Sequence, residues 1–163
     1  MSDAAPVSDD RPRARLRRRL AVEAERLGFS GLGVTTPEAV PDLAPDLAGF
    51  LAAGHHATMG WMAETAERRA SPRGLWPEVR SIVVTAFDYG PADDPMAGLA
   101  QPTRGVISAY ARNRDYHDVV KGRLKELAGG LVAEARRAGI EGDVKVFVDT
   151  APVMEKPLAI AAG

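Results

Sequence analysis

The spacing of apolar residues changes several times along the chain, and each spacing predicts one kind of element. From Leu16 to Leu27 apolar residues recur every three or four positions, which is typical of an amphipathic helix, and Gly28 follows as a C-terminal cap. The other elements expected in the first half are a strand over residues 29–36, a helix over 37–51, one or two helical turns over 59–69 and a loop over 70–80.

The second half predicts buried strands and one long helix. Residues 81–87 are continuously apolar and β-branched, which is typical of a strand buried on both faces. The long Pro- and Gly-rich loop over residues 88–105 is of the kind that is usually functional or mobile. The remaining elements are a strand over 106–111, a helix from its N-cap Asp115 to its cap Gly139, an alternating strand over 143–149 and a helix from Pro152.

Strands therefore alternate with helices, and this order predicts an α/β (α+β) fold with a mixed β-sheet flanked by helices. Residues 1–10 are small and polar and are expected to form a disordered lead-in, so the domain is expected to span residues 11–163. The chain stops at Gly163 inside an apolar run, which suggests a domain that is truncated at its C-terminus.

Composition narrows the function classes. Of the 163 residues, 45% are hydrophobic and 26% are charged, as in a soluble globular protein, and a net charge of −1 gives no overall basic field for nucleic acid. No cysteine is present, which excludes thiolate and iron–sulfur ligation by this chain. The three histidines lack metal-ligand spacing, and His55 and His56 are interpreted as loop residues. Without a signal peptide or spanning segment, a cytoplasmic location is expected.

Several segments carry candidate chemistry, each with a plainer alternative. The basic run at the start of the first helix is either a phosphate-facing patch or a solvated helix face, of which the second is commoner; it comprises Arg11, Arg13, Arg15, Arg17, Arg18 and Arg19. Met59, Trp61 and Met62 are either core residues or a flat wall for a cofactor.

The segment AYARNRDYH, residues 109–117, gathers polar side chains where a strand is expected to meet a helix. Free N–H groups at a helix N-terminus suit anionic or amide groups of a ligand. An N-cap with ordinary surface charges is the alternative, and the spacing does not separate the two. The residues concerned are Tyr110, Arg112, Asp115, Tyr116 and His117.

The segment VFVDTAPVMEK places Asp149 at the end of the last expected strand. Asp149 can serve as a general acid if partial burial raises its pKa, whereas the alternative is that it caps the following helix. Glu155 and Lys156 pair either with each other or with a ligand, and a solvated pair is the simpler expectation.

Together these motifs resemble one family. LGFSGLGVT, HATMGWM, SIVVTAFDY, AYARNRDYH and FVDTAPVMEK occur in the order found in epoxyqueuosine reductases, over nearly the whole chain after residue 10. The resemblance implies a cytoplasmic oxidoreductase of tRNA processing that binds cobalamin and reduces epoxyqueuosine to queuosine in the tRNA anticodon wobble position. It also implies that Asp149 is the proton donor. The cofactor is expected to contact Tyr110, Arg112, Asp115, Tyr116, His117, Met59, Trp61 and Lys156.

This sequence departs from the family in two informative ways. Lys156 stands where the family has arginine, so the planar fork of a guanidinium is absent. The family continues into motifs for two 4Fe–4S clusters, whose cysteines this chain lacks, so turnover by the fragment alone is not expected. A cobalamin- or tRNA-binding module without redox chemistry, or a related cobalamin-dependent reductase such as a dehalogenase, are the alternatives. No metal ligand is predicted, and the oligomeric state is not predicted.

Overall fold

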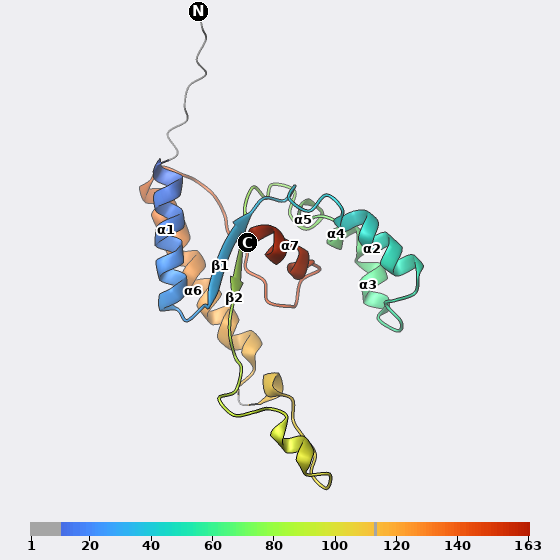
Figure 1. Cartoon of the computed structure of the whole chain (residues 1–163). Helices are drawn as coiled ribbons and strands as arrows, with labels where there is room; N and C mark the ends of the chain where they lie inside the picture. Colours follow the sequence, from blue (N-terminus) through green and yellow to red (C-terminus); the bar gives the residue numbers. More distant parts are fainter. Residues whose placement is uncertain (1–10, 113) are drawn as a thin grey trace, which may run out of the picture.

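The computed structural model describes residues 11–112 and 114–163, so the lead-in expected over residues 1–10 lies outside the described part. Helices, two short strands and two 3₁₀ turns alternate along the chain (Figure 1). In order they are α1 Arg11–Arg26, β1 Gly31–Thr35, α2 Leu43–Ala52, α3 Gly60–Glu64, α4 Ala66–Arg69, α5 Pro72–Leu75, β2 Ile82–Ala86, η1 Ala97–Ala100, η2 Ala109–Ala111, α6 Tyr116–Arg137 and α7 Glu155–Ala162. The α+β class is thus confirmed.

The sheet is an antiparallel pair of strands, in which Gly31 of β1 lies opposite Ala86 of β2. Helix α7 packs against both strands on one side, and α1 and α6 lie on the other (Figure 1). Gly33 makes the approach of α7 possible, because a Cβ atom there would lie 2.7 Å from the Cβ of Ala162. A side chain at this position would therefore displace α7, the helix that carries Glu155.

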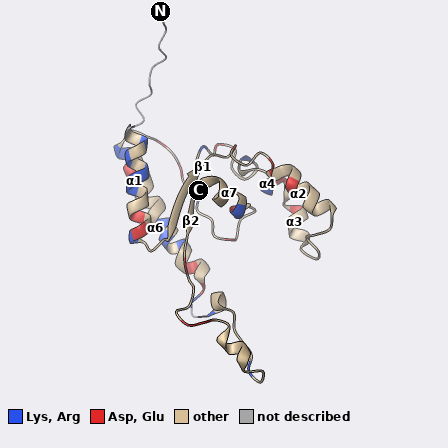
Figure 2. Ribbon diagram, viewed as in Figure 1, with Lys and Arg blue, Asp and Glu red and all other residues tan. Residues whose placement is uncertain are grey.

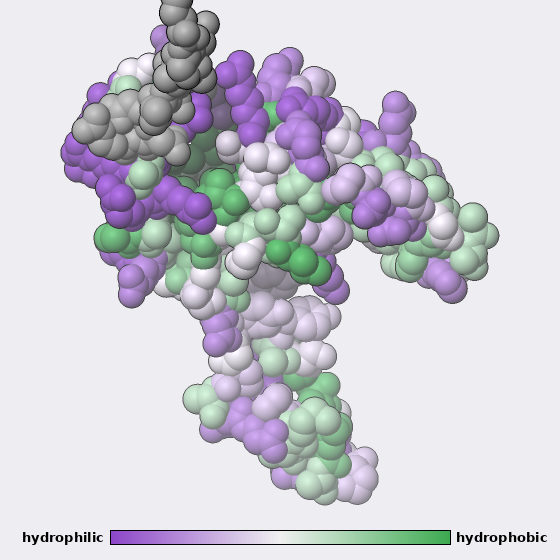
Figure 3. All heavy atoms as spheres, turned by 45° about the horizontal axis from the view of Figure 1, so that its top comes forward, coloured by the Kyte–Doolittle hydropathy of each residue, from purple (hydrophilic) through white to green (hydrophobic). Residues whose placement is uncertain are grey.

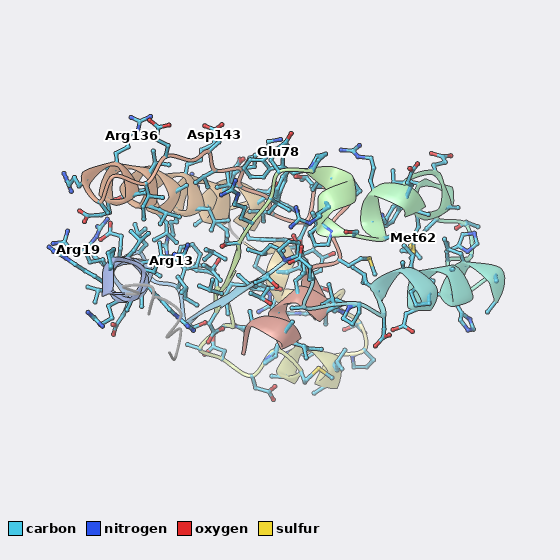
Figure 4. The ribbon with its side chains drawn as sticks, turned by 90° about the horizontal axis from the view of Figure 1, so that it is seen from above. Arg13, Arg19, Met62, Glu78, Arg136 and Asp143 are labelled. Atoms are coloured by element: carbon cyan, nitrogen blue, oxygen red, sulfur yellow. The ribbon has the colours of Figure 1, made fainter. Side chains whose placement is uncertain are left out.

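The main core forms between α1 and α6, which run side by side (Figures 1 and 4). The apolar stripe predicted for the first helix is buried, and it meets the stripe of the long helix; the buried residues are Leu20, Ala24, Leu27, Phe29, Val120, Leu127 and Val148. Gly28 and Gly139 take left-handed backbone angles, with φ of 80° and 71°, as expected of residues that end helices. These contacts hold the start of α6 at the edge of the sheet.

Charged residues cover the outer faces of this helix pair (Figure 2). Arg19 of α1 pairs with Glu134 of α6, and Arg26 pairs with Glu126 of α6 and with Glu23 of its own helix. The arginine run therefore contributes at least one ion pair between helices. Because these groups are partly exposed, such pairs contribute little stability, about 0–1 kcal/mol each.

The helix expected over residues 37–51 begins six residues later, at Leu43. Two turns precede it, closed by Ala39 N–H to Thr36 O and Leu43 N–H to Val40 O, in a stretch where Pro37 and Pro41 supply no N–H group. The loop expected over 70–80 was also wrong in part. It contains α5, whose N-cap Ser71 accepts a hydrogen bond from Arg73 N–H at 3.2 Å.

Two expected strands are wrong. Residues 106–111 contain only the 3₁₀ turn η2, and residues 143–149 form no regular element. The strand predicted at 81–87 does form, but it is not buried on both faces, since Val83 remains 36% exposed. In the described residues β1 and β2 pair only with each other, so the sheet is antiparallel rather than mixed. A strand needs a hydrogen-bonded neighbour, and apolar alternation alone does not supply one.

Residues between β2 and α6 form an arm that extends away from the sheet (Figure 1). Apolar side chains reach the surface on this arm and across the middle of the face seen in Figure 3. On the arm they include Met96, Leu99, Val106 and Ile107, which are 42–65% exposed. None of the described helices has the length and apolar character needed to cross a membrane.

Candidate functional site

Asp149 lies in a tight turn after the buried residue Val148. Its φ is 52°, a left-handed angle, and Thr150 N–H donates a 2.6 Å hydrogen bond to the carbonyl oxygen of Val148 across it. Such a γ-turn with a left-handed central residue is rare and strained, and strained residues cluster at functional sites. The alternative in which Asp149 caps a helix is wrong, because α7 begins after Met154 without a side-chain cap.

The start of α6 brings two side chains to Asp149. The hydroxyl of Tyr116 donates a hydrogen bond to Asp149 Oδ2, and His117 Nε2 lies 3.7 Å from the same oxygen. Their two rings stack with centroids 4.1 Å apart. Tyr116 and His117 thus face the same oxygen atom of Asp149, which lies 33 positions after Tyr116 in the sequence.

Asp115 fixes the histidine from the other side. Its Oδ1 accepts the N–H of His117 at 2.9 Å as the predicted N-cap of α6, and it lies 2.8 Å from His117 Nδ1. The imidazole therefore sits between two carboxylates, Asp115 and Asp149. A histidine between two acids is held in one orientation.

The hydrogen bond from Tyr116 sets the proton affinities of this pair. It lowers the pKa of Asp149 below its ordinary value, and the charge of His117 acts in the same direction, against the effect of burial. The same bond raises the pKa of Tyr116 to about 12. Asp149 was expected to serve as a general acid if burial raised its pKa, whereas in the structure its pKa is lowered. At neutral pH the carboxyl group of Asp149 is therefore ionised, so that by itself it accepts a proton rather than donating one.

Glu155, the first residue of α7, supplies the second carboxyl group. Its Oε1 accepts the N–H of Asp149 at 3.2 Å. Burial raises the pKa of Glu155, and the neighbouring carboxyl of Asp149 raises it further. The expected solvated pair of Glu155 with Lys156 is therefore wrong, because Glu155 turns inward to the turn of Asp149 while Lys156 is exposed.

Tyr89 completes the group, which we call the Asp149 cluster: Tyr89, Asp115, Tyr116, His117, Asp149 and Glu155. The ring of Tyr89 stacks on that of Tyr116 at 5.6 Å and is 53% exposed. Sequence reasoning missed Tyr89 as a site residue, although its position shortly after β2 was a usable signal. The cluster offers three carboxyl groups, two phenols and one imidazole, which together suit proton transfer.

Three further residues expected at the site do not join the cluster. Tyr110 of η2 is 57% exposed, and Arg112 donates from Nε to the carbonyl oxygen of Ile107 at 3.0 Å. Lys156 is exposed beside Glu155. None of the three makes a hydrogen bond or ring contact with the cluster within residues 11–112 and 114–163.

Met59 and Trp61 lie on the separate lobe formed by α2 to α5 (Figure 1). They are 38% and 49% exposed, so the interpretation as core residues is wrong. Trp61 is covered in part by Arg69, whose guanidinium carbon lies 4.8 Å from the ring centre. Their neighbour Met62 is labelled in Figure 4 at the opposite side of the molecule from Arg19 of α1. Within the described residues, no hydrogen bond or ring contact of Asp149, Tyr116 or His117 involves Met59 or Trp61.

An apolar groove of about 530 Å³ runs between α2 and α7. Its walls include Leu43, Leu47 and Phe50 of α2 and Pro157 and Ile160 of α7. No member of the Asp149 cluster lines it. No group of three metal-binding side chains is arranged to hold a metal ion among the residues that the structure describes.

Residues 69–150 match the family described as epoxyqueuosine reductase QueG, DUF1730, and the match includes every member of the Asp149 cluster except Glu155. Similar proteins named epoxyqueuosine reductase occur in Xanthomonas campestris (37% identical, 89% of this chain and 40% of the relative), Pseudomonas aeruginosa (36%, 92% and 40%) and Escherichia coli (35%, 84% and 35%). This chain thus spans about two fifths of these relatives. No solved structure matches it. On the profile match over half its length, the chain belongs to the epoxyqueuosine reductase QueG family.

Proposed function

We propose that this chain forms the proton-donating part of an epoxyqueuosine reductase, an enzyme that reduces epoxyqueuosine to queuosine in the anticodon wobble position of tRNA. The observation that carries the proposal is the contact of Asp149 with Tyr116 and His117. All three residues lie inside the segment that matches the family, and Asp149 lies 33 positions after Tyr116. The relatives are named for this reaction.

The reaction defines what the cluster must deliver. Removing an epoxide oxygen as water consumes two electrons and two protons. Asp149 is the group we assign to take up a proton and deliver it to the departing oxygen, because its carboxyl group is held in place by a strained turn and by the Tyr116 hydroxyl. Tyr116 keeps its own proton at neutral pH, so it orients Asp149 rather than replacing it.

Cobalamin is the cofactor that the family resemblance implies, and when bound it would supply the reducing centre for the epoxide. The described residues fit one requirement of a corrin, a flat and largely apolar ring bordered by amide groups. Tyr89 presents an exposed ring stacked on Tyr116 beside the acid, and Tyr110 is a second exposed ring on the same arm. Arg112 and Lys156 are exposed donors for amide oxygens. We assign no role to Met59 and Trp61, which lie on the other lobe.

The electrons require a path that this chain does not contain. With no cysteine among 163 residues, it offers no thiolate for the two 4Fe–4S clusters expected of the family. The ligands for such clusters would belong to the three fifths of the relatives that this chain does not match. A tRNA partner and a cytoplasmic location go with this proposal.

A chimera tests the proposal while accounting for the partial coverage. In an Escherichia coli strain without its own epoxyqueuosine reductase, this chain replaces the 138-residue matched segment of the native enzyme. Nucleosides from digested tRNA are then quantified by mass spectrometry. We expect queuosine to return. Accumulation of epoxyqueuosine, with the chimera expressed and folded and the native enzyme active, would contradict the proposal. Retained cobalamin binding in that case would point to a binding module without redox chemistry.

A further inference from the structure

The Asp149 cluster contains one more acid than the proposed role of Asp149 uses. Glu155 sits six residues further along, at the first turn of α7, and its carboxyl oxygen accepts the backbone N–H of Asp149 at 3.2 Å. This contact holds the carboxyl group of Glu155 against the strained turn that carries Asp149. A reaction that consumes two protons needs a source that refills the donor, and Glu155 is an ionisable group that contacts Asp149 without donating to it.

The surroundings of the two acids favour one proton between them. The ionisable groups facing them are Tyr116, His117 and Asp115 from the start of α6 and Tyr89 from the arm. His117 is the one group of this set that can carry a positive charge, and it lies on the side of Asp149 Oδ2 and is shared with Asp115. Lys156 is exposed. Two neighbouring carboxyl groups do not both ionise freely.

We propose that Asp149 and Glu155 share a single proton, which Glu155 holds in the resting protein and returns to Asp149 during turnover. During turnover the Glu155 carboxyl transfers this proton to the Asp149 carboxylate. Asp149 then gives it to the departing oxygen and becomes a carboxylate again, and Glu155 is refilled from water. Glu155 acts through Asp149 and is therefore a positioning and relay residue. Its part in turnover rests on the proposed function, whereas the shared proton does not.

The proton affinities agree with this geometry. The pKa of Glu155 is raised, first by burial and then by Asp149, while the pKa of Asp149 is lowered, first by the Tyr116 hydroxyl. The proton of the pair therefore rests on Glu155. Neighbouring carboxyls whose environments push their pKa values apart are a recurrent arrangement for acid and base roles.

The first test uses this 163-residue chain alone. Side-chain carboxyl carbons are followed by ¹³C NMR from pH 3 to 9, with Glu155 identified by the signal lost in Glu155→Gln. We expect Glu155 to titrate above an ordinary glutamate and its midpoint to fall in Asp149→Asn, because the neighbouring charge is gone. A midpoint at or below the ordinary value, or one that Asp149→Asn leaves unchanged, overturns the shared proton. Glu141→Gln, at an exposed glutamate after α6, is the control.

The second test uses the chimera and a pH profile of turnover. Glu155→Gln keeps an oxygen for the Asp149 N–H but carries no acidic proton. We expect its turnover to fall about tenfold or more at pH 8 and far less at pH 5.5, so that the alkaline limb moves to lower pH. Glu155→Asp should restore part of that limb. An equal loss at every pH would mean a purely structural role and overturn the relay. If the unmutated chimera is inactive, the proposed function fails, and the NMR titration still decides whether the proton is shared.

Discussion

The left-handed turn at Asp149 makes an unusual prediction about stability. With φ at 52°, any side chain with a Cβ atom is strained there, and left-handed backbone costs an L-residue about 1–2 kcal/mol. Glycine avoids this strain but loses about 0.4–1 kcal/mol through its freer unfolded chain. Asp149→Gly should therefore be more stable than Asp149→Ala by about 0.5–1 kcal/mol. Because both variants lack the carboxylate, their difference isolates the backbone.

Urea unfolding followed by circular dichroism measures this difference. Lys125, exposed in the middle of α6, provides the control, because there alanine should exceed glycine by about 1 kcal/mol. The sign of the Gly–Ala difference must therefore reverse between the two positions. If alanine is the more stable variant at position 149 as well, the strained turn is wrong, and with it the reason for the fixed direction of the carboxyl group.

Three further predictions concern the packing of α7 and the proton affinities of the site. Gly33→Ala should destabilise the chain by about 1–3 kcal/mol in urea unfolding, because its Cβ would lie 2.7 Å from the Cβ of Ala162 in α7. Gly31→Ala should change stability little, because its Cβ would lie 3.5 Å from the Cβ of Ala86, an ordinary contact. Tyr116→Phe should raise the ¹³C NMR titration midpoint of Asp149, because it removes the largest cause of the lowered pKa; an unchanged midpoint would refute that cause. Since the folded pKa of Glu155 is raised, its stabilising effect is full below the unfolded pKa and is lost as pH rises through the folded pKa. Glu155→Gln should therefore gain stability relative to the unmutated chain as the pH rises above the ordinary pKa of glutamate, whereas a constant difference would contradict the raised pKa.

Local chemistry made parts of the fold predictable from sequence. The stripe that includes Leu20 and Leu27 is buried as its spacing indicated. Asp115 begins α6, and Gly28 and Gly139 follow the ends of their helices, as expected. Each of these features depends on residues within a turn or two of one another. The α+β class follows from the same local periodicities.

Features that depend on distant partners were not predictable. Residues 143–149 alternate like a strand, but no neighbour pairs with them in the described residues. The same limit applies at the site. The family motifs identified Tyr116 and Asp149 separately, yet only the structure shows that the phenol bonds to the carboxylate and lowers its pKa. Glu155 was misread for the same reason, because its partner is a backbone N–H group six residues earlier.

The queuosine content of tRNA with Asp149→Asn in the chimera tests whether Asp149 is the proton donor. Asparagine tolerates left-handed backbone, so the turn is retained while the acidic proton is lost. We predict that the unmutated chimera produces queuosine and that Asp149→Asn leaves epoxyqueuosine, at unchanged protein level. Queuosine formation by Asp149→Asn at the unmutated rate would contradict the assignment of Asp149 as the proton donor.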